Sequence, residues 1–311
     1  MKTEIKREII ASLEHFMKLH GLSANKVSNE TGISSSYISI MRSGAETIKV
    51  GDSEVEIADR YYEQIAMLTG YALQKSYWEP RNTAQAARII STLEDAKRFG
   101  DTNLVIGETG CGKTYVARVF ARKHPVDFFI ITVGSEDFIN DIIEKIAIAT
   151  KLRLTAKSKS RRISEIIKHL KAMRVKGYKP LLYFDESEYM KQSMLMSMKE
   201  LYDNLQGVCG IVLGGTDQLL TNIEKLRKKN KPGIPQFYRR IKFGIRLLPA
   251  IDKSYSEFIG EYDKPLQRFL KENCDNYGEL HDVLVPALRE ADRTGEPLSE
   301  EFVKMVLAIR H

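Results

Sequence analysis

The chain has 311 residues, of which 43% are hydrophobic and 29% are charged, and its formal net charge is +7. This length predicts two or three compact units with sizeable cores. The apolar runs are all much shorter than the ~20 residues of a membrane-spanning helix, and the charges in the first residues do not fit a signal peptide. Three widely spaced cysteines argue against a disulfide framework or a Cys-only metal site and fit a reducing cytosol.

The first 52 residues predict an all-α helix-turn-helix module. The first helix has one apolar face that ends before Gly21 and consists of Ile9, Leu13, Phe16 and Met17. Ser23 and Ser34 can each cap a short helix, and Gly32 permits the tight turn between them. Two short helices joined in this way resemble the helix-turn-helix of phage repressors.

The second short helix offers polar side chains for contacts to a DNA backbone and a few bases, namely Ser34, Ser35, Ser36, Tyr37, Ser39 and Arg42. Residues 1–80, however, carry a net charge of −2, which weakens this module as the main DNA anchor. A protein-interaction role and a DNA-binding role both stay open for it.

Residues 53–80 predict a helical linker that breaks at Pro80, and the α/β core is predicted to follow at residues 81–250. Within that core, five short apolar runs alternate with helix-length segments: "NLVIG", "FFIITV", "PLLYFDE", "GIVLGG" and "FGIRLLP". This alternation favours a parallel sheet covered on both faces. The β pattern ends after Pro249, so residues 251–311 predict a small helical lid.

The stretch "GETGCGKT" predicts a nucleotide-binding phosphate loop because it follows an apolar strand and precedes a helix. Its backbone amides and the start of the next helix are expected to cradle the phosphates of ATP. The predicted contacts are Gly107, Glu108, Thr109, Gly110, Cys111, Gly112, Lys113 and Thr114. Lys113 is expected to pair with the β- and γ-phosphates, and Thr114 to coordinate Mg²⁺.

Two further strand ends complete this predicted ATPase site. Asp185 and Glu186 follow "PLLYF", so we expect Asp185 to hold Mg²⁺, mostly through water, and Glu186 to activate the attacking water. Thr216 follows "GIVLGG", where a polar side chain can sense the γ-phosphate or position that water. Arg239 and Arg240 precede the fifth run; they can act on a neighbouring subunit's nucleotide, or they can belong to a basic patch for nucleic acid.

The positive charge is concentrated in two short blocks. Residues 151–179 carry a net charge of +10 and residues 224–250 carry +8. Such blocks are typical of a surface that binds a polyanion, and phosphate contacts from Lys and Arg give affinity without sequence readout. The DNA-binding candidates are Lys157, Lys159, Arg161 and Arg162 in the first block and Arg227, Lys228 and Lys229 in the second.

Together, the phosphate loop, the Asp185–Glu186 pair and the two arginines resemble the AAA+ ATPase family over residues 81–311. The resemblance implies a sheet order of 5-1-4-3-2, an ATP-bridged interface between subunits, and a helical lid. One element departs from the family pattern. Many members carry a lid arginine in a Gly-x-x-Arg context, where this chain has Gly278 and His281.

A helix-turn-helix placed before an AAA+ core resembles, in length and order, the phage Mu B type of transposition ATPase. That resemblance implies binding of ATP, assembly of a homo-oligomer, as a helical filament, on double-stranded DNA, and delivery of this DNA to a transposase. Hydrolysis then releases the protein from unsuitable sites. The implied setting is the cytoplasm of a bacterial host, on DNA and without a membrane partner. The alternative is a helix-turn-helix transcriptional repressor with an ATP-sensing core.

Overall fold

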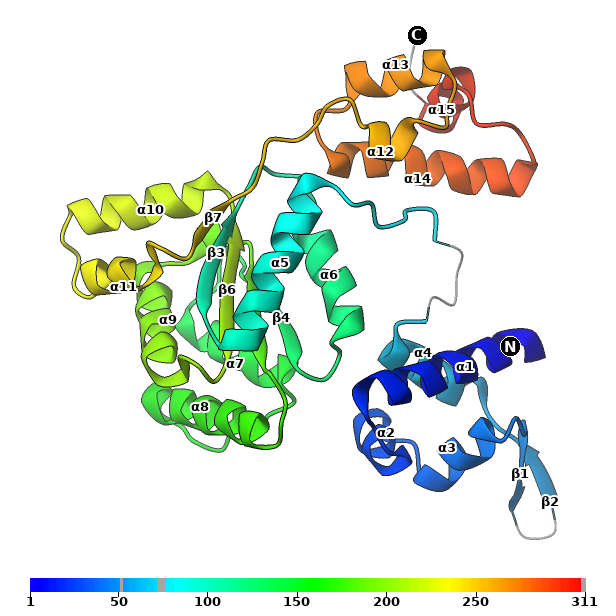
Figure 1. Ribbon diagram of the computed structural model, residues 1–311, viewed down its shortest axis with the longest axis horizontal. Helices are drawn as coiled ribbons and strands as arrows, with labels where there is room; N and C mark the ends of the chain where they lie inside the picture. The colour runs from blue at the N-terminus through cyan, green and yellow to red at the C-terminus, as the bar shows by residue number, and fades with distance from the viewer. Residues whose placement is uncertain (51–52, 72–75, 309–311) are drawn as a thin grey trace. The chain divides into compact units, whose positions relative to one another are not determined.

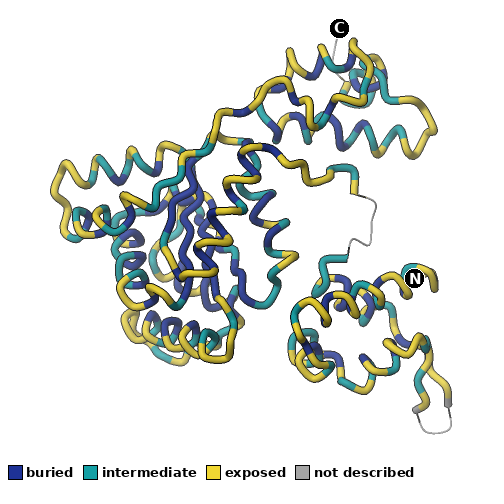
Figure 2. The backbone as a smooth tube through the Cα atoms, in the orientation of Figure 1, coloured by how far each residue is buried: buried dark blue, intermediate teal, exposed yellow. Residues whose placement is uncertain are grey.

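The computed structural model describes residues 1–50, 53–71 and 76–308. The chain divides into an N-terminal unit, Met1–Ser76, and a C-terminal unit, Tyr77–His311, and each is described by itself (Figure 1). Each unit has its own apolar core, and Figure 2 marks the buried residues of both units in dark blue.

The N-terminal unit begins with three helices, α1 (Thr3–His20), α2 (Ala24–Thr31) and α3 (Ser35–Arg42). At the start of α2, the hydroxyl of Ser23 accepts a hydrogen bond from the backbone amide of Lys26. The hydroxyl of Ser34 caps α3 in the same way. Gly32, with φ of 73°, makes the turn between the two helices. These local features agree with the expected caps and turn, because each depends only on neighbouring residues.

The expectation of an all-α module followed by a helical linker was wrong. Strands β1 (Thr47–Val50) and β2 (Ser53–Glu56) form an antiparallel hairpin, and α4 (Asp59–Thr69) packs on α1 in the same core. "TIKV" alternates polar and apolar residues, and in "SEVE" Val55 lies between two glutamates, which is a period-2 pattern that favours strands.

One buried lysine explains why this hairpin belongs to the N-terminal unit. Lys6 of α1 is only 2% exposed, and its ammonium donates to Glu56 at 2.9 Å and lies 3.3 Å from Glu46 and 3.7 Å from Asp59. The three carboxylates come from the two ends of the hairpin and the start of α4. The hydrogen bond to Glu56 raises the pKa of Lys6, so the charged form ties these segments to α1.

The C-terminal unit contains a parallel sheet of five strands, β3 (Thr102–Ile106), β4 (Phe128–Thr132), β5 (Leu181–Asp185), β6 (Gly210–Gly215) and β7 (Ile245–Leu247). Their order is β4-β5-β6-β3-β7. Numbered from the strand before the phosphate loop, this is the predicted order 5-1-4-3-2, so the predicted fold class is confirmed for the α/β core.

Helices cover both faces of the sheet. Helices α5 (Ala84–Phe99) and α6 (Lys113–Lys123) pack on one face with Val105, Tyr183 and Val212. The other face contacts α7 (Ile139–Ala149), α8 (Lys159–Val175), α9 (Gln192–Leu205), α10 (Asp217–Lys228) and α11 (Ile234–Ile241) (Figure 1). Because successive side chains of a strand point to opposite faces, both faces must be apolar, which explains the continuous apolar runs.

The lid follows β7 and consists of α12 (Ser256–Ile259), α13 (Lys264–Asn273), α14 (Tyr277–Thr294) and α15 (Glu300–Val306). It has a core of its own, which includes Tyr255, Leu270 and Leu284, and one side chain of the phosphate loop, Cys111, packs into that core. Among the helices in the described ranges, none has the length and apolar character needed to cross a membrane.

Candidate nucleotide site and basic surfaces

The predicted phosphate loop lies between the end of β3 and the start of α6. Gly110 and Gly112 have φ angles of 73° and 94°, a left-handed conformation that glycine adopts without strain. A Cβ on Gly110 would also lie only 2.1 Å from Oδ1 of Asn276 in the lid. The loop therefore needs glycine for its turns and for its close contact with the lid.

Lys113 is the first residue of α6 and folds back over the loop. Its ammonium donates to the carbonyl oxygens of Gly107, at 2.8 Å, and Glu108, at 2.9 Å. The ammonium thus lies at the centre of the loop, next to the amides at the start of α6. A helix N-terminus and a lysine that face one space form a site for an anion such as a phosphate.

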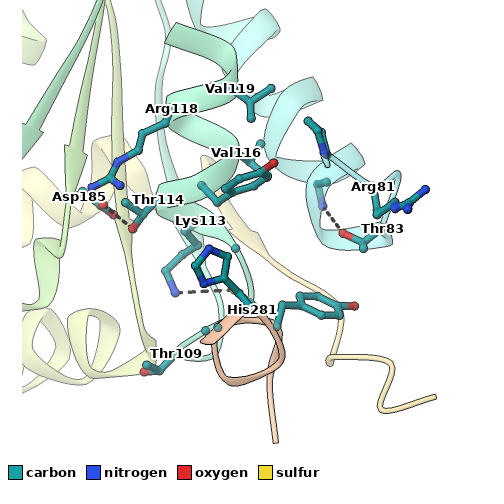
Figure 3. A pocket seen from close by; sticks show the side chains of 18 of the residues that line it. Arg81, Thr83, Thr109, Lys113, Thr114, Val116, Arg118, Val119, Asp185 and His281 are labelled. Atoms are coloured by element: carbon teal, nitrogen blue, oxygen red, sulfur yellow. Dashed lines mark hydrogen bonds between the residues drawn. The ribbon is translucent and has the colours of Figure 1, made fainter. Parts of the chain in front are cut away.

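The two predicted metal ligands, Thr114 and Asp185, are hydrogen-bonded to each other. Oγ1 of Thr114 donates to Oδ2 of Asp185 at 2.6 Å (Figure 3), and Asp185 is only 2% exposed. The hydroxyl of Tyr183 lies 3.5 Å from Oδ1 of the same carboxylate. Burial, and then the charge of Asp185, raise the pKa of Tyr183, so Tyr183 stays a donor. A hydroxyl beside a fixed carboxylate fits the oxygen ligands that Mg²⁺ prefers.

Beside this pair lies a cavity that three more polar residues line. Glu186 follows β5 with a left-handed φ of 55°, and it is exposed to the cavity. Thr216 is the residue before α10, at the end of β6. Glu188, which sequence reasoning missed, also lines the cavity, and its Oε2 atom is buried without a hydrogen-bond partner among the described residues. The only available signal for Glu188 was its place as the third acidic residue of "DESE".

The cavity has a volume of about 410 Å³ and lies between the core and the lid. Its polar side is the phosphate loop with Asp185 and Glu186. Its apolar side consists of Trp78, Pro80, Ala86, Ile90, Val116, Phe258 and Tyr277. A phosphate site beside an apolar wall suits a nucleotide, whose base is planar and largely apolar.

The lid contacts the phosphate loop directly. The amide of Gly278, in the first turn of α14, donates to the carbonyl of Gly110 at 3.2 Å. His281, one turn further along α14, lines the same cavity as Lys113 (Figure 3). Its ring lies edge-on to Trp78 at 5.3 Å, and its Nδ1 lies 2.9 Å from Oδ1 of Asp282.

The two predicted finger arginines lie on α11, and neither lines the nucleotide cavity of its own chain. Arg240 is held within the chain, since Nε donates to Oδ1 of Asp203 at 2.5 Å and Nη1 to the carbonyl of Gln236 at 2.9 Å. Arg239 is exposed and makes no hydrogen bond or ion pair within the described ranges. The two neighbouring arginines therefore differ in their freedom to reach another molecule.

Part of the second basic block lines one hollow of about 450 Å³ at the end of α10 and on α11. Its lining is Arg227, Lys228, Pro235, Tyr238, Arg239 and Lys242. Arg227 is bonded to Glu224 at 2.7 Å and lies over the ring of Tyr238 at 4.5 Å. The structure thus brings Arg239 together with two of the DNA-binding candidates; Lys229, the third of that block, is exposed after α10.

The DNA-binding candidates of the first basic block lie at and before the start of α8. Lys157, Lys159 and Arg161 are exposed, whereas Arg162 forms an ion pair with Glu144 and is partly buried. In the N-terminal unit, Arg42 forms an ion pair with Glu14. Both paired arginines have less free charge to offer a polyanion than sequence alone implied.

Comparison with known proteins agrees with this geometry. Residues 101–223 match a family model described as an AAA domain. The chain is 21% identical to the Mu-like prophage FluMu DNA transposition protein B of Haemophilus influenzae, over 70% of this chain and 72% of that protein. Among solved structures, Cdc6p of Pyrobaculum aerophilum is 14% identical with a TM-score of 0.53, covering 81% of this chain and 68% of that one.

A second solved structure, the ORC2 protein of Aeropyrum pernix with ADPNP and ADP, is 18% identical with a TM-score of 0.48, covering 73% of this chain and 66% of that one. The matched AAA domain spans the phosphate loop, Asp185 at the end of β5, Glu186 after it, and Thr216. The predicted resemblance to AAA+ ATPases of the phage Mu B transposition protein type is confirmed. The C-terminal unit therefore has the fold of AAA+ proteins, and its residues 101–223 are similar to an AAA domain, a class of domain that hydrolyses nucleotide.

Proposed function

We propose that this chain is an ATP-dependent, largely sequence-nonspecific DNA-binding ATPase that oligomerises on DNA and delivers that DNA to a transposase. Its similarity to a DNA transposition protein B supports the transposition role. The observation that carries the proposal is that the nucleotide cavity and both strongly basic surfaces belong to the same unit. ATP binding and DNA binding can therefore be linked without the N-terminal unit.

At the nucleotide, each predicted residue has a separate task. The amides of residues 107–112 surround the phosphates, and Lys113 pairs with the β- and γ-phosphate oxygens. Thr114 and Asp185 hold Mg²⁺, which, when bound, supplies positive charge against the phosphates. Glu186 takes a proton from the attacking water, while Thr216 orients that water.

DNA binding is assigned to the exposed basic residues. Lys157, Lys159 and Arg161 near α8, and the group Arg227, Lys228 and Lys229 near α10, contact DNA phosphates in this proposal. Such contacts give affinity that does not depend on base sequence and that falls steeply with salt. Arg162 and Arg227 take a smaller part because Glu144 and Glu224 neutralise them.

The assembly on DNA is proposed to complete each active site with an arginine from the next subunit. Arg239 is exposed and has no ion-pair partner among the described residues, so it is the better candidate for this role, because Arg240 would first have to leave Asp203. An arginine supplied in trans stabilises the charge that develops on the transferred phosphoryl group. Hydrolysis would then depend on assembly, so that ATP binding controls when the protein binds DNA and ATP hydrolysis controls when it is released.

The test is DNA binding measured against nucleotide state. Fluorescence anisotropy with random double-stranded DNA should show binding with a slowly hydrolysed ATP analogue and little with ADP, and electron microscopy should show filaments. DNA binding that is indifferent to nucleotide, in a protein that hydrolyses ATP, would remove the proposal. Protection of a single operator in footprinting, in place of uniform coverage, would indicate the repressor alternative.

A further inference from the structure

A short segment of the C-terminal unit, residues 77–85, contacts both the core and the lid, and we call it the strap. The ring of Trp78 stacks on Phe258 of the lid at 4.8 Å and meets His281 of the lid edge-on at 5.3 Å. On the other side, the hydroxyl of Tyr115 on α6 donates to the carbonyl of Trp78 at 3.1 Å. The strap therefore bridges the two bodies that enclose the nucleotide cavity.

The last residue of the strap, Gln85, is 1% exposed and uses both ends of its amide. Nε2 donates to the carbonyl oxygens of Pro249, at 3.2 Å, and Ala250, at 2.7 Å. These two residues form the connection between β7 and the lid. Oε1 of Gln85 accepts a hydrogen bond from the hydroxyl of Tyr277, the first residue of α14, at 3.2 Å. Burial raises the pKa of Tyr277, so its hydroxyl stays a donor.

This arrangement links the core–lid connection to the phosphate loop. Tyr277 directly precedes Gly278, whose amide donates to the carbonyl of Gly110. Tyr277 and Gly278 both line the nucleotide cavity. Burying an amide side chain costs free energy unless its donors and its acceptor all form hydrogen bonds. The Gln85 amide forms all of its hydrogen bonds only when the strap, the connection at residues 249–250 and the lid lie in the arrangement described above.

We propose that Gln85 is a positioning residue that, together with Trp78, sets the lid in its closed orientation over the nucleotide. The inference rests on nucleotide binding in this cavity, which is part of the proposed function. Opening the lid about residues 249–250 would break the Gln85–Tyr277 bond and separate the Trp78–Phe258 stack. A nucleotide that touches loop, strap and lid together favours the closed state, as expected for a ligand that binds one of two conformations better.

Loss of the Gln85 amide should therefore weaken nucleotide binding without removing the chemistry. Lys113, Asp185 and Glu186 lie on the core and do not contact Gln85. We expect Gln85→Leu to weaken binding of ADP and of an ATP analogue about tenfold, and Tyr277→Phe, which loses one hydrogen bond, about threefold. At saturating ATP, turnover of Gln85→Leu should stay within about twofold of the parent, because the reacting groups are unchanged and Gln85 does not line the cavity.

The chain contains a single tryptophan, Trp78, so its fluorescence reports on the strap–lid stack. The full-length protein is titrated with ADP and with the ATP analogue in the absence of DNA, and binding is measured in parallel by calorimetry. The parent should show a nucleotide-dependent change in emission, and both variants should need correspondingly more nucleotide for it. Arg293→Gln on α14, whose side chain is 73% exposed, serves as the control and should behave as the parent.

The outcomes separate the two proposals. The proposed role of Gln85 is overturned if the variants bind nucleotide with the affinity of the parent. It is also overturned if the Trp78 fluorescence of the parent does not change when nucleotide binds. Irreversibly misfolded protein is distinguished from the expected result, because it lowers the number of binding sites per chain in calorimetry but leaves the midpoint of the titration unchanged. Reversible unfolding also shifts the midpoint, so equal thermal stability of parent and variants without nucleotide is required to contradict a merely structural role. A parent that binds no nucleotide overturns the proposed function and this inference with it, whereas a failure of DNA binding leaves this inference standing.

Discussion

Thr114 and Asp185 lie 71 residues apart in the chain, yet Oγ1 of Thr114 donates to Oδ2 of Asp185 at 2.6 Å. One comes from the helix after β3 and the other from the end of β5. Because the strands are parallel, their carboxyl ends meet at one edge of the sheet, which is where ligands bind in α/β folds. The predicted magnesium ligands are thus already in contact, and the remaining residues of the cavity can be tested around them.

Lys113→Ala should abolish nucleotide binding and, with it, DNA binding. The ammonium of Lys113 lies at the centre of the phosphate loop, and losing a charge-assisted contact to two phosphates should weaken ATP binding about 100-fold or more. Calorimetry with the ATP analogue measures the loss. Lys123→Ala, an exposed lysine at the far end of the same helix, is the matched control. Unchanged affinity in Lys113→Ala would contradict the placement of the phosphates.

Glu186→Gln should keep ATP bound but stop turnover, which should trap the protein on DNA. Glu188→Gln is its matched partner, since Glu188 lines the same cavity two residues further on. We expect a loss of turnover of about 100-fold or more for Glu186→Gln and a small effect for Glu188→Gln. The readouts are phosphate release and the lifetime of the DNA complex. The reverse pattern would assign the base to Glu188, whose Oε2 is buried without a partner among the described residues.

The sequence predicts well those features that depend on neighbouring residues or on a short motif. The caps at Ser23 and Ser34, the glycine turns of the phosphate loop and the position of Asp185 at a strand end are of this kind. The sheet order followed from the resemblance to a known family. In each case, the physical cause lies within a few residues of the feature itself, or in a topology that the motif implies.

The remaining features depend on contacts between distant segments. Through three carboxylates, Lys6 ties the hairpin and the start of α4 to α1, and this hairpin replaced an expected helix. Gln85 reaches a connection 164 residues later in the chain. Likewise, the ion pair of Arg162 with Glu144 could not be distinguished in sequence from the free charge of Arg161. Single-sequence patterns carry no information about such partners, because many other pairings satisfy the same composition.

Arg239→Ala should lower hydrolysis on DNA without changing ATP binding by the isolated protein. If Arg239 acts on the neighbouring subunit, mixing this variant with Glu186→Gln should restore part of the activity, since each protein supplies what the other lacks. Arg240→Ala, which loses the contact with Asp203, is compared in the same assay. Rescue of Arg240→Ala but not of Arg239→Ala would transfer the role to Arg240.

The salt dependence of DNA binding tests the two basic surfaces. Lys159→Ala, Arg161→Ala and Lys228→Ala each remove one exposed charge, so each should reduce the slope of log K against log salt by about 0.9 and weaken binding similarly on all sequences. Lys264→Ala, at the start of α13 in the lid, is the control and should leave the slope unchanged. Arg162→Ala should change the slope less than Arg161→Ala, because Glu144 already neutralises Arg162. Equal slopes for the parent and all three test variants would exclude these surfaces as the DNA contact.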